Sequence, residues 1–365
     1  MLLAHKIEIR PTPEQEQHFE QACGSSRHLY NNLVTHFSQK DVKFSKKSAR
    51  EFYYNSRKEF EWYNTLSTEI FQSTIDNLES AFKGFFKLGR GFPKLKKKGV
   101  KDSFRISQSP KFSVIGRDLR LEKFNKKKDQ LPIKLREKLR FEGKTKQVTV
   151  SKSGGKWFAS ILVEVESGYN RKHPKNNIEV GIDLGIKTLV TTSDGESTGK
   201  SNKLSKQLNK LTKLQQKLSR QKKGSNRRAK TKQKIQKLYF YVGQEKQALL
   251  HSVSDKLTSI YGTICMEDLD VKSMLEKGNN KLSRMIADVG MYELRRQITY
   301  KSFLRGGKVL FVDKYFPSSK KCSSCGNIKN DLKLSDRIYK CDCGLSIDRD
   351  LNAARNIFIE GLKQL

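Results

Sequence analysis

No stretch of this sequence approaches the length of a membrane-spanning helix, which needs about 20 consecutive apolar residues. The opening residues, MLLAHKIEIRPTPEQ, also lack the apolar core and the small-residue cleavage site of a secretory signal peptide. We therefore expect a cytoplasmic protein with no membrane partner. Because disulfide bonds are rare in the cytosol, the six cysteines need a different explanation.

Several catalytic signatures are missing as well. The sequence contains no P-loop and no G-x-S-x-G motif, and its six histidines form no His-Asn-His nuclease pattern. Cys265 has no base beside it in sequence. With these chemistries excluded, carboxylates are the remaining candidates for catalysis.

Acidic residues are scarce relative to basic ones. Lys and Arg number 74 against 38 for Asp and Glu, so the formal net charge is +36. Packing of the chain against itself cannot explain this imbalance, whereas a polyanionic partner can. Nucleic acid is the first candidate, because neutralising its phosphates releases counterions and gives strong binding. An anionic membrane surface is the second and fits poorly with the lack of a spanning segment.

Residues 198–244 contain no acidic residue at all. Within this stretch, 15 of the 38 residues in 200–237 are Lys or Arg. Leucines at three- or four-residue steps from Leu204 to Leu218 predict an amphipathic helix, and a turn at Gly224 leads into a second helix. The pattern fits a solvated helical face, but the absence of acids favours contact with an RNA or DNA backbone. The residues we expect to make this contact are Lys217, Arg220, Lys222, Lys223, Arg227 and Arg228. A second basic patch contains Lys94, Lys96, Lys97 and Lys98.

The order of predicted elements divides the chain into regions. A strand at residues 3–10 precedes a largely helical stretch, and β-branched segments from about 103 to 168 return to strands, with a hairpin loop at 153–155. A helical block therefore interrupts a small β domain, and a polar linker leads to a mixed α/β region that includes a helical run at roughly 281–304. The boundaries we expect are 1–13 and 92–170 for the β domain, 14–91 for the helical domain and 171–365 for the α/β domain, which contains a basic helical hairpin at 200–258.

Three acidic residues lie at strand ends or at a helix start. Asp183 and Glu267 each end an apolar strand, and Asp350 opens the final helix. Such edges of an α/β sheet commonly bind ligands, and three carboxylates at one place would repel one another without cations. Mg²⁺ prefers oxygen ligands, and two ions can support phosphodiester hydrolysis. Alternatively, each acid caps a helix or pairs with a lysine, and Asp348 rivals Asp350 as the third ligand.

Four of the six cysteines form a C-x-x-C and a C-x-C pair separated by fifteen residues. They are Cys322, Cys325, Cys341 and Cys343. Four thiolates at this spacing suit one structural, tetrahedral zinc ion, with free thiols as the alternative. The other two, Cys23 and Cys265, are interpreted as buried packing residues.

Four segments carry a resemblance to a known family. GIDLGIKTL around Asp183, MEDL around Glu267, the cysteine module and DRDLNAARNI around Asp350 resemble the TnpB family, transposon-encoded RNA-guided nucleases related to type V CRISPR effectors. Further segments resemble the family in the expected order, so the likeness covers most of the chain: GSSRHLYNN, NLESAFKGFFK, FPKLKKK, LSRQKKGS and YFPSSKKCSSCG.

The resemblance implies a multidomain α/β fold with a RuvC-like (RNase H-type) nuclease domain, into which a zinc-binding module is inserted at 316–344. It also implies that the N-terminal β domain is a barrel-like wedge domain interrupted by a helical recognition domain. The family's catalytic triad falls on Asp183, Glu267 and Asp350, since the motif has its ligand directly before x-N-A-A. Asp348 then becomes a cap or a supporting residue.

The partners that the resemblance implies are a guide RNA and target double-stranded DNA, bound by a monomer or by a dimer on RNA. Positions that read a short DNA motif beside the target fall on Phe44, Ser48, Thr68 and Gln72, for which packing and solvated surface are the alternatives. A guided DNA-binding repressor without nuclease activity, or an accessory protein of transposition, remains the competing function. The intact carboxylates argue against the repressor.

Overall fold

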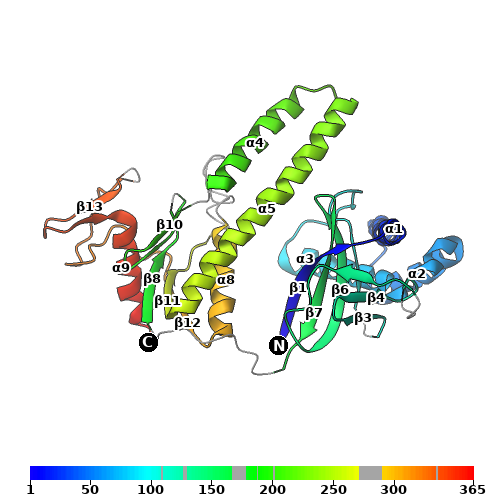
Figure 1. The fold of residues 1–365 in the computed structure, drawn as a ribbon, viewed down its shortest axis with the longest axis horizontal. Helices are drawn as coiled ribbons and strands as arrows, with labels where there is room; N and C mark the ends of the chain where they lie inside the picture. Colours follow the sequence, from blue (N-terminus) through cyan, green and yellow to red (C-terminus); the bar gives the residue numbers. More distant parts are fainter. Residues whose placement is uncertain are drawn as a thin grey trace. The chain divides into compact units, whose positions relative to one another are not determined.

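The computed structural model describes residues 1–107, 110–125, 130–166, 178–186, 188–199, 202–270, 290–333 and 336–365. The chain forms two compact units, Met1–Gly168 and Tyr169–Leu365 (Figure 1). Among the helices of these described ranges, none is both long enough and apolar enough to cross a membrane. The two units are described separately below.

The helical part of the first unit consists of separate helices. They are α1 (Pro13–His36), α2 (Lys46–Glu59), the 3-10 helix η1 (Glu61–Thr65) and α3 (Thr68–Leu88). Thr12 begins α1 with a capping box to Gln15, and Ser45 begins α2 in the same way. Gly89, in the left-handed conformation, ends α3.

A seven-stranded antiparallel sheet forms the rest of this unit, in the order β2-β6-β7-β1-β5-β4-β3. The strands are β1 (Leu2–Arg10), β2 (Ser103–Ile106), β3 (Phe112–Ile115), β4 (Asp118–Leu121), β5 (Ile133–Leu135), β6 (Lys144–Ser153) and β7 (Lys156–Glu164). The edge strand β3 comes into contact with β6 near the opposite edge, so the sheet nearly closes. Gly154 and Gly155 both have positive φ and form the two-residue turn between β6 and β7, as the sequence predicts.

The second unit contains a five-stranded sheet in the order β10-β9-β8-β11-β12. Its strands are β8 (Ile178–Asp183), β9 (Thr188–Thr192), β10 (Ser197–Gly199), β11 (Tyr261–Glu267) and β12 (Lys308–Val312). The first three pair antiparallel, whereas β8, β11 and β12 are parallel. The carboxyl ends of β8, β11 and β12 therefore meet at one edge.

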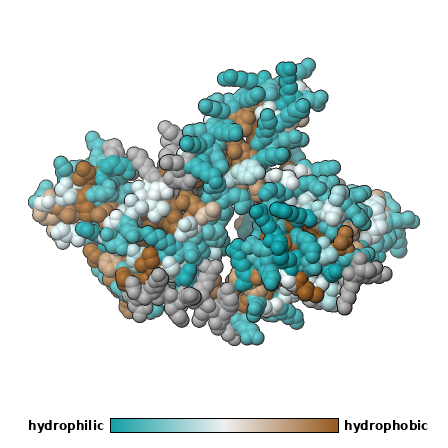
Figure 2. All heavy atoms as spheres, in the orientation of Figure 1, coloured by the Kyte–Doolittle hydropathy of each residue, from teal (hydrophilic) through white to brown (hydrophobic). Residues whose placement is uncertain are grey.

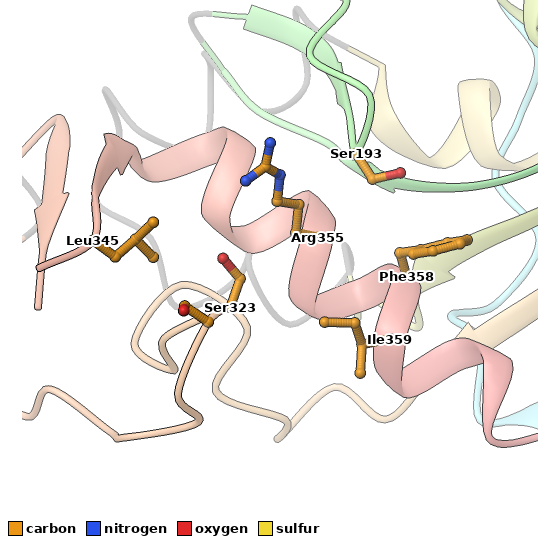
Figure 3. A pocket seen from close by; sticks show the side chains of 7 residues that line it. Ser193, Ser323, Leu345, Arg355, Phe358 and Ile359 are labelled. Carbon is orange, nitrogen blue, oxygen red and sulfur yellow. The ribbon is translucent and has the colours of Figure 1, made fainter. Parts of the chain in front are cut away.

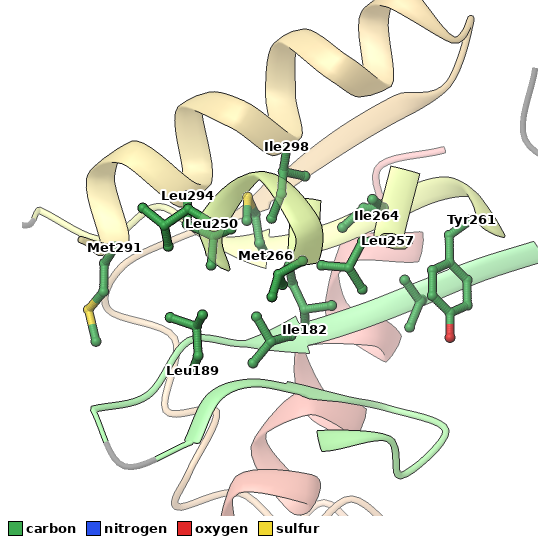
Figure 4. Packing of buried hydrophobic residues seen from close by; sticks show 13 residues of the cluster. Ile182, Leu189, Leu250, Leu257, Tyr261, Ile264, Met266, Met291, Leu294 and Ile298 are labelled. Carbon is green, nitrogen blue, oxygen red and sulfur yellow. The ribbon is translucent and has the colours of Figure 1, made fainter. Parts of the chain in front are cut away.

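Helices cover both faces of this sheet. Helices α5 (Asn226–Ile260) and α8 (Met291–Leu304) cover one face and α9 (Arg349–Leu362) covers the other, whereas α4 (Asn202–Ser219) packs on α5. Apolar side chains of α5 and α8 pack on one face, against Ile182, Ile264 and Met266 (Figure 4). Each of these fully buried side chains stabilises the fold by roughly 2 kcal/mol. The part of the predicted 281–304 helix before residue 290 lies outside the described residues.

Helix α4 and the first half of α5 form the helical hairpin that the sequence predicts. Leu204 and Leu211 of α4 and Ile235 of α5 are buried along its seam. Hydrophilic side chains cover its outside (Figure 2). The cysteine-containing segment precedes α9 and adds the small antiparallel pair β13 (Ile338–Lys340) and β14 (Ser346–Asp348).

Candidate active site

Asp183 and Glu267 lie at the ends of neighbouring parallel strands and on the same face of the sheet. Side chains alternate along a strand, so Val180 and Ile182 of β8 face the α5/α8 core while Asp183 faces away from it. The same alternation in β11 turns Met266 inward and Glu267 outward. Met266 is paired with Ile182 in the β-ladder, so the next residues along the two strands, Glu267 and Asp183, lie beside each other.

Helix α9 covers this second face and brings Asp350 to the same edge. It packs closely on β8 at Gly181, where an added Cβ would lie 2.6 Å from the backbone nitrogen of Phe358. Three residues after Phe358 along α9, a Cβ on Gly361 would lie 2.6 Å from the Cβ of Cys265 in β11. Neither glycine can be replaced without moving the helix. Asp350 sits in the first turn of α9.

Asp348, the other candidate for the third ligand, binds the first turn of α9 in the structure. Its Oδ1 accepts hydrogen bonds from the backbone N–H groups of Asp350 at 2.9 Å and Leu351 at 3.1 Å. Asp348 is therefore the N-cap of α9. One of its oxygens is already engaged by these backbone bonds, which leaves Asp350 as the acid free to face the strand ends.

The pKa values indicate that the three carboxylates share one neighbourhood. Burial, followed by the charges of Glu267 and Asp350, raises the pKa of Asp183 to about 7, and Arg349 opposes the shift. Burial also raises the pKa of Glu267, while a hydrogen bond from the Ser318 hydroxyl lowers it. The charges of Glu267 and Asp350 therefore act on Asp183, which indicates that the three side chains lie near one another at this edge of the sheet.

The carboxylates are more widely spaced than the cysteines. Among the described residues, the group of ligand side chains whose ligand atoms all lie within 4.8 Å of one another is Cys322, Cys325, Cys341 and Cys343. The three acids do not form so tight a group.

The four cysteines form a cluster that could hold a zinc ion. The Sγ atoms of Cys322 and Cys343 are 3.7 Å apart, and those of Cys325 and Cys341 are 3.6 Å apart. Tetrahedral coordination at about 2.3 Å per Zn–S bond requires sulfur–sulfur distances of about 3.8 Å. These two sulfur–sulfur distances match those of a tetrahedral zinc site, and all four sulfur atoms lie within 4.8 Å of one another. Cys23 and Cys265 are buried away from this cluster, as the sequence predicts.

Each cysteine pair is followed by a glycine that closes a tight turn. Gly326 donates its N–H to the carbonyl of Cys322 at 3.0 Å, and Gly344 donates to the carbonyl of Cys341 at the same distance. Both glycines have positive φ, which other residues rarely adopt. The bond in the C-x-x-C pair spans four residue steps, whereas the bond in the shorter C-x-C pair spans three.

Two asparagines that the sequence analysis did not single out connect the cysteine segment to α9. Asn352 and Asn356 are 0% and 3% exposed. Their side-chain amides donate to the carbonyl of Lys321 at 2.7 and 2.6 Å, and Asn356 also donates to the carbonyl of Ser318 at 2.8 Å. Buried amides without partners are costly, so these bonds fix the loop on the helix.

A pocket of about 540 Å³ lies beside α9. It is lined by Ser193, Ser323, Ser324, Leu345, Arg355, Phe358 and Ile359. Figure 3 shows Arg355 extending from α9, with Phe358 and Ile359 further along the same helix and Ser193 at the neighbouring strand end. The Arg355 guanidinium makes no hydrogen bond or ion pair with any described residue, so its charge is available to a ligand.

The predicted basic contacts are mostly exposed. In the α4–α5 hairpin, Lys217, Arg220, Lys222, Lys223 and Arg227 are exposed around its tip. Arg228 differs, because its guanidinium donates to the carbonyls of Leu218 and Gln221 and closes the turn. In the other basic patch Lys94, Lys97 and Lys98 are exposed, and the Lys96 ammonium lies 3.9 Å from the centre of the Tyr30 ring.

The four candidate readers of the flanking motif all have partners within the first unit. Phe44 stacks on Phe82 with 4.6 Å between ring centres, and Ser48 bonds to Ser45 in the capping box of α2. Thr68 accepts from Lys111 at 3.1 Å. Gln72 accepts from Arg50 at 3.1 Å, which makes Arg50 a neighbour that the sequence analysis missed.

Comparison with protein families gives three matches. A family described as "Probable transposase" (OrfB_IS605) matches residues 160–278, a Cas12f1-like TNB domain matches 292–357, and a helix-turn-helix domain matches 1–36. In the structure, the last of these stretches is strand β1 followed by the single helix α1. The first two matches cover the strands and helix that carry the three carboxylates.

Similar proteins extend over the whole chain. It is 32% identical to "Putative RNA-guided DNA endonuclease InsQ" of Escherichia coli K12, over 99% of this chain and 92% of that protein. It is 31% identical to a Streptomyces pristinaespiralis protein named "Putative RNA-guided DNA endonuclease", over 98% of this chain and 89% of that one. A solved Cas12f1–sgRNA–target DNA complex has the same fold, with a TM-score of 0.57 at 17% identity over 95% of this chain and 83% of that one.

Proposed function

Because this chain belongs to the TnpB family, we propose that it is an RNA-guided DNA endonuclease that binds its target through a transposon-derived guide RNA, beside a short flanking motif. The reaction is hydrolysis of DNA phosphodiester bonds at Asp183, Glu267 and Asp350. One observation carries the proposal: after burial, the charges of Glu267 and Asp350 raise the pKa of Asp183, which supports the grouping of the three acids at one edge of the sheet.

The topology of the second unit supports a RuvC-like, RNase H-type nuclease domain spanning residues 171–365. Three antiparallel strands are followed by two parallel ones, and α9 covers the face that carries the carboxylates. The zinc-binding module is an insertion at 316–344, between β12 and α9. In the first unit, the β domain (1–13 and 92–170) is the wedge and 14–91 is the recognition domain.

Magnesium is the cofactor we propose for the carboxylates. The donor set fits it, because all three ligands are hard oxygens and because the raised pKa of Asp183 indicates charge that a cation would neutralise. Two Mg²⁺ ions, when bound, supply an activated water and stabilise the leaving 3′ oxygen. Asp183, Glu267 and Asp350 are the residues that would hold these ions. Arg349 limits the negative charge of the centre.

Zinc is the ion we propose for the cysteine cluster. Four thiolates leave no position for water or substrate, so the ion has a structural task. Through Asn352 and Asn356, the folded module is held against the helix that carries Asp350. The metal-bound module therefore supports the nuclease centre without taking part in the reaction.

The basic surfaces are the proposed nucleic-acid contacts. The α4–α5 hairpin and the lysines of 94–98 would hold the guide RNA and its duplex with DNA, mainly through phosphates. The pocket beside α9 offers an unpaired guanidinium, three serine hydroxyls and an apolar floor, which suits one nucleotide of a DNA strand leading to the carboxylates. Phe44, Ser48, Thr68 and Gln72, together with Arg50, are the proposed surface for the flanking motif.

The test is cleavage by the assembled complex. The protein would be expressed with RNA transcribed from the 3′ flank of its own gene, and the complex would be challenged with a plasmid library of flanking motifs beside a matched target. We expect Mg²⁺-dependent cleavage that disappears in Asp183→Ala, while RNA retention and target binding persist. Binding without cleavage by the unmodified protein would instead identify a guided repressor, and failure to retain a defined RNA would favour an accessory protein.

A further inference from the structure

Ser318 contacts one of the proposed metal ligands. It lies six residues after the end of β12 and is 4% exposed. Its hydroxyl donates a hydrogen bond to Oε1 of Glu267, which stands at the end of β11. Val312, the last residue of β12, is the ladder partner of Glu267. The chain therefore leaves the sheet beside Glu267 and returns to it with Ser318.

The backbone around Ser318 is held in place from α9. The Asn356 amide donates to the carbonyl of Ser318 at 2.8 Å and to that of Lys321 at 2.6 Å. Asn352 donates to the same Lys321 carbonyl and accepts from the N–H of Ser323 at 3.0 Å. Because both amides are buried, the loop cannot move without leaving polar groups unpaired. The Ser318 hydroxyl is thus a fixed donor.

We propose that Ser318 is a positioning residue of the carboxylate centre, which holds Oε1 of Glu267 so that the second oxygen faces the cation. This inference rests on the proposed function. A carboxylate that binds a metal through one oxygen is commonly oriented by a hydrogen bond to the other, and loss of such a bond lowers metal affinity or activity by about 10- to 100-fold.

The same loop joins the two metal sites. Cys322 is 1% exposed and lies between Lys321 and Ser323, the two residues whose backbones Asn352 holds. Ser318 and Cys322 are the two ends of one short segment. An ion bound by the cysteines would fix the segment at Cys322, while Ser318 orients Glu267. The carboxylate centre depends on the cysteine cluster through this path of hydrogen bonds.

The neighbouring Ser319 provides a matched control. It is partly buried in the same loop, and its side chain makes no hydrogen bond with any described residue. Ser318→Ala and Ser319→Ala each remove one hydroxyl oxygen, from adjacent positions. Ser318→Thr keeps a hydroxyl at position 318. All three would be made in the full-length protein.

Two measurements test the inference. The first is Mn²⁺ binding to the full-length protein, followed by the loss of the free-ion signal in electron paramagnetic resonance, with Asp183→Ala defining the binding that belongs to the carboxylates. The second is single-turnover cleavage by the RNA complex as a function of Mg²⁺. We expect Ser318→Ala to weaken Mn²⁺ binding and raise the half-saturating Mg²⁺ concentration by about 10- to 100-fold. Ser319→Ala should match the unmodified protein, and Ser318→Thr should recover part of the loss.

Zinc content and the midpoint of thermal unfolding show whether Ser318 positions Glu267 or only supports the folded loop. The inference is supported if the Ser318→Ala protein keeps its zinc and its midpoint of thermal unfolding but binds Mn²⁺ more weakly. Unchanged Mn²⁺ affinity, or a loss of affinity that is matched by lost zinc or an earlier midpoint, would overturn it, as would a Ser318→Thr variant no better than Ser318→Ala. If the unmodified protein cuts no DNA, the proposed nuclease function fails while Mn²⁺ binding still decides the role of Ser318.

Discussion

The cysteine cluster and the carboxylate centre are built in contrasting ways. The cysteines come from one segment, Cys322 to Cys343, and their sulfur atoms lie within 4.8 Å of one another. The carboxylates come from two strands and a helix that are far apart in sequence, from Asp183 to Asp350, and among the described residues they do not form such a group. The cysteine arrangement could hold an ion between four thiols, whereas we propose that the carboxylates bind ions that also contact water and a phosphate.

The two sites also depend to different degrees on tertiary contacts in the rest of the fold. Local turns at Gly326 and Gly344 suffice to bring the thiols together. The carboxylates depend instead on the sheet register and on close packing of α9 against Gly181. A site assembled over long distances is therefore more sensitive to changes elsewhere in the chain. The predictions below test this contrast, from the largest expected effect to the smallest.

The largest effect is expected at the third carboxylate. Asp350→Ala should reduce single-turnover cleavage by at least about 1,000-fold, since it removes a metal ligand that stabilises the transition state by several kcal/mol. Asp348→Ala removes only a helix cap, which costs about 1 kcal/mol of stability, and should leave cleavage within about 10-fold. The reverse ranking of the two variants would assign the ligand to Asp348.

Removing a cysteine should act through the fold. Cys341→Ser should release the zinc ion, measured by elemental analysis, and lower the thermal midpoint of the second unit, because metal binding supplies the folding energy of the module. Cleavage should then fall by roughly 100-fold through the loss of support for the carboxylates. Ser324→Ala in the same segment is the control and should keep its zinc. A Cys341→Ser protein with full zinc content would contradict the cluster.

The stability of the protein without Mg²⁺ should depend on pH through Asp183. Its pKa is raised in the folded state to about 7, so between about pH 4 and pH 7 the folded protein binds a proton that the unfolded chain releases. The free energy of unfolding should therefore fall as pH rises through this range, by on the order of 2 kcal/mol for a partly buried group. Asp183→Asn should flatten this dependence in urea melts at pH 5 to 8.

Adding Mg²⁺ provides the control for that pH dependence. At pH 8 the ion should restore stability to the unmodified protein, because it neutralises the ionised carboxylates, and should do little for Asp183→Asn. A stability that rises between pH 5 and pH 8 without Mg²⁺, and that Asp183→Asn does not alter, would show that the acids do not crowd one another.

The smallest effect is expected at the pocket beside α9. Arg355→Ala should weaken DNA engagement about three- to fivefold and reduce the slope of log affinity against log salt by about one, as expected for one lost phosphate contact. Lys363→Ala, which removes a positive charge near the other end of α9, should have no such effect. Equal changes in the two variants would indicate general electrostatics in place of a specific contact.

Much of this organisation follows from sequence patterns. Alternating apolar residues predict β8 and β11, and their ends identify Asp183 and Glu267. The cysteine spacing predicts the cluster, and the leucine repeat from Leu204 predicts the hairpin. These features depend on local periodicity or on short spacings, which a single sequence contains.

Other features depend on tertiary contacts and were missed or left open. The three-residue strand β5 is too short to show a period. Spacing alone could not choose between Asp348 and Asp350, because the choice depends on the helix starting at Arg349. The roles of Ser318 and Asn356 arise only when segments distant in sequence come together. No local pattern marks such residues.

Helix α5 has a mechanical consequence. It runs for 35 residues, about 50 Å, from the exposed tip of the basic hairpin into the core, and ends at Ile260. Strand β11 starts at the next residue and ends at Glu267, with no loop between them to absorb a displacement. A displacement of the hairpin along the axis of α5 would therefore act directly on the strand that ends at Glu267.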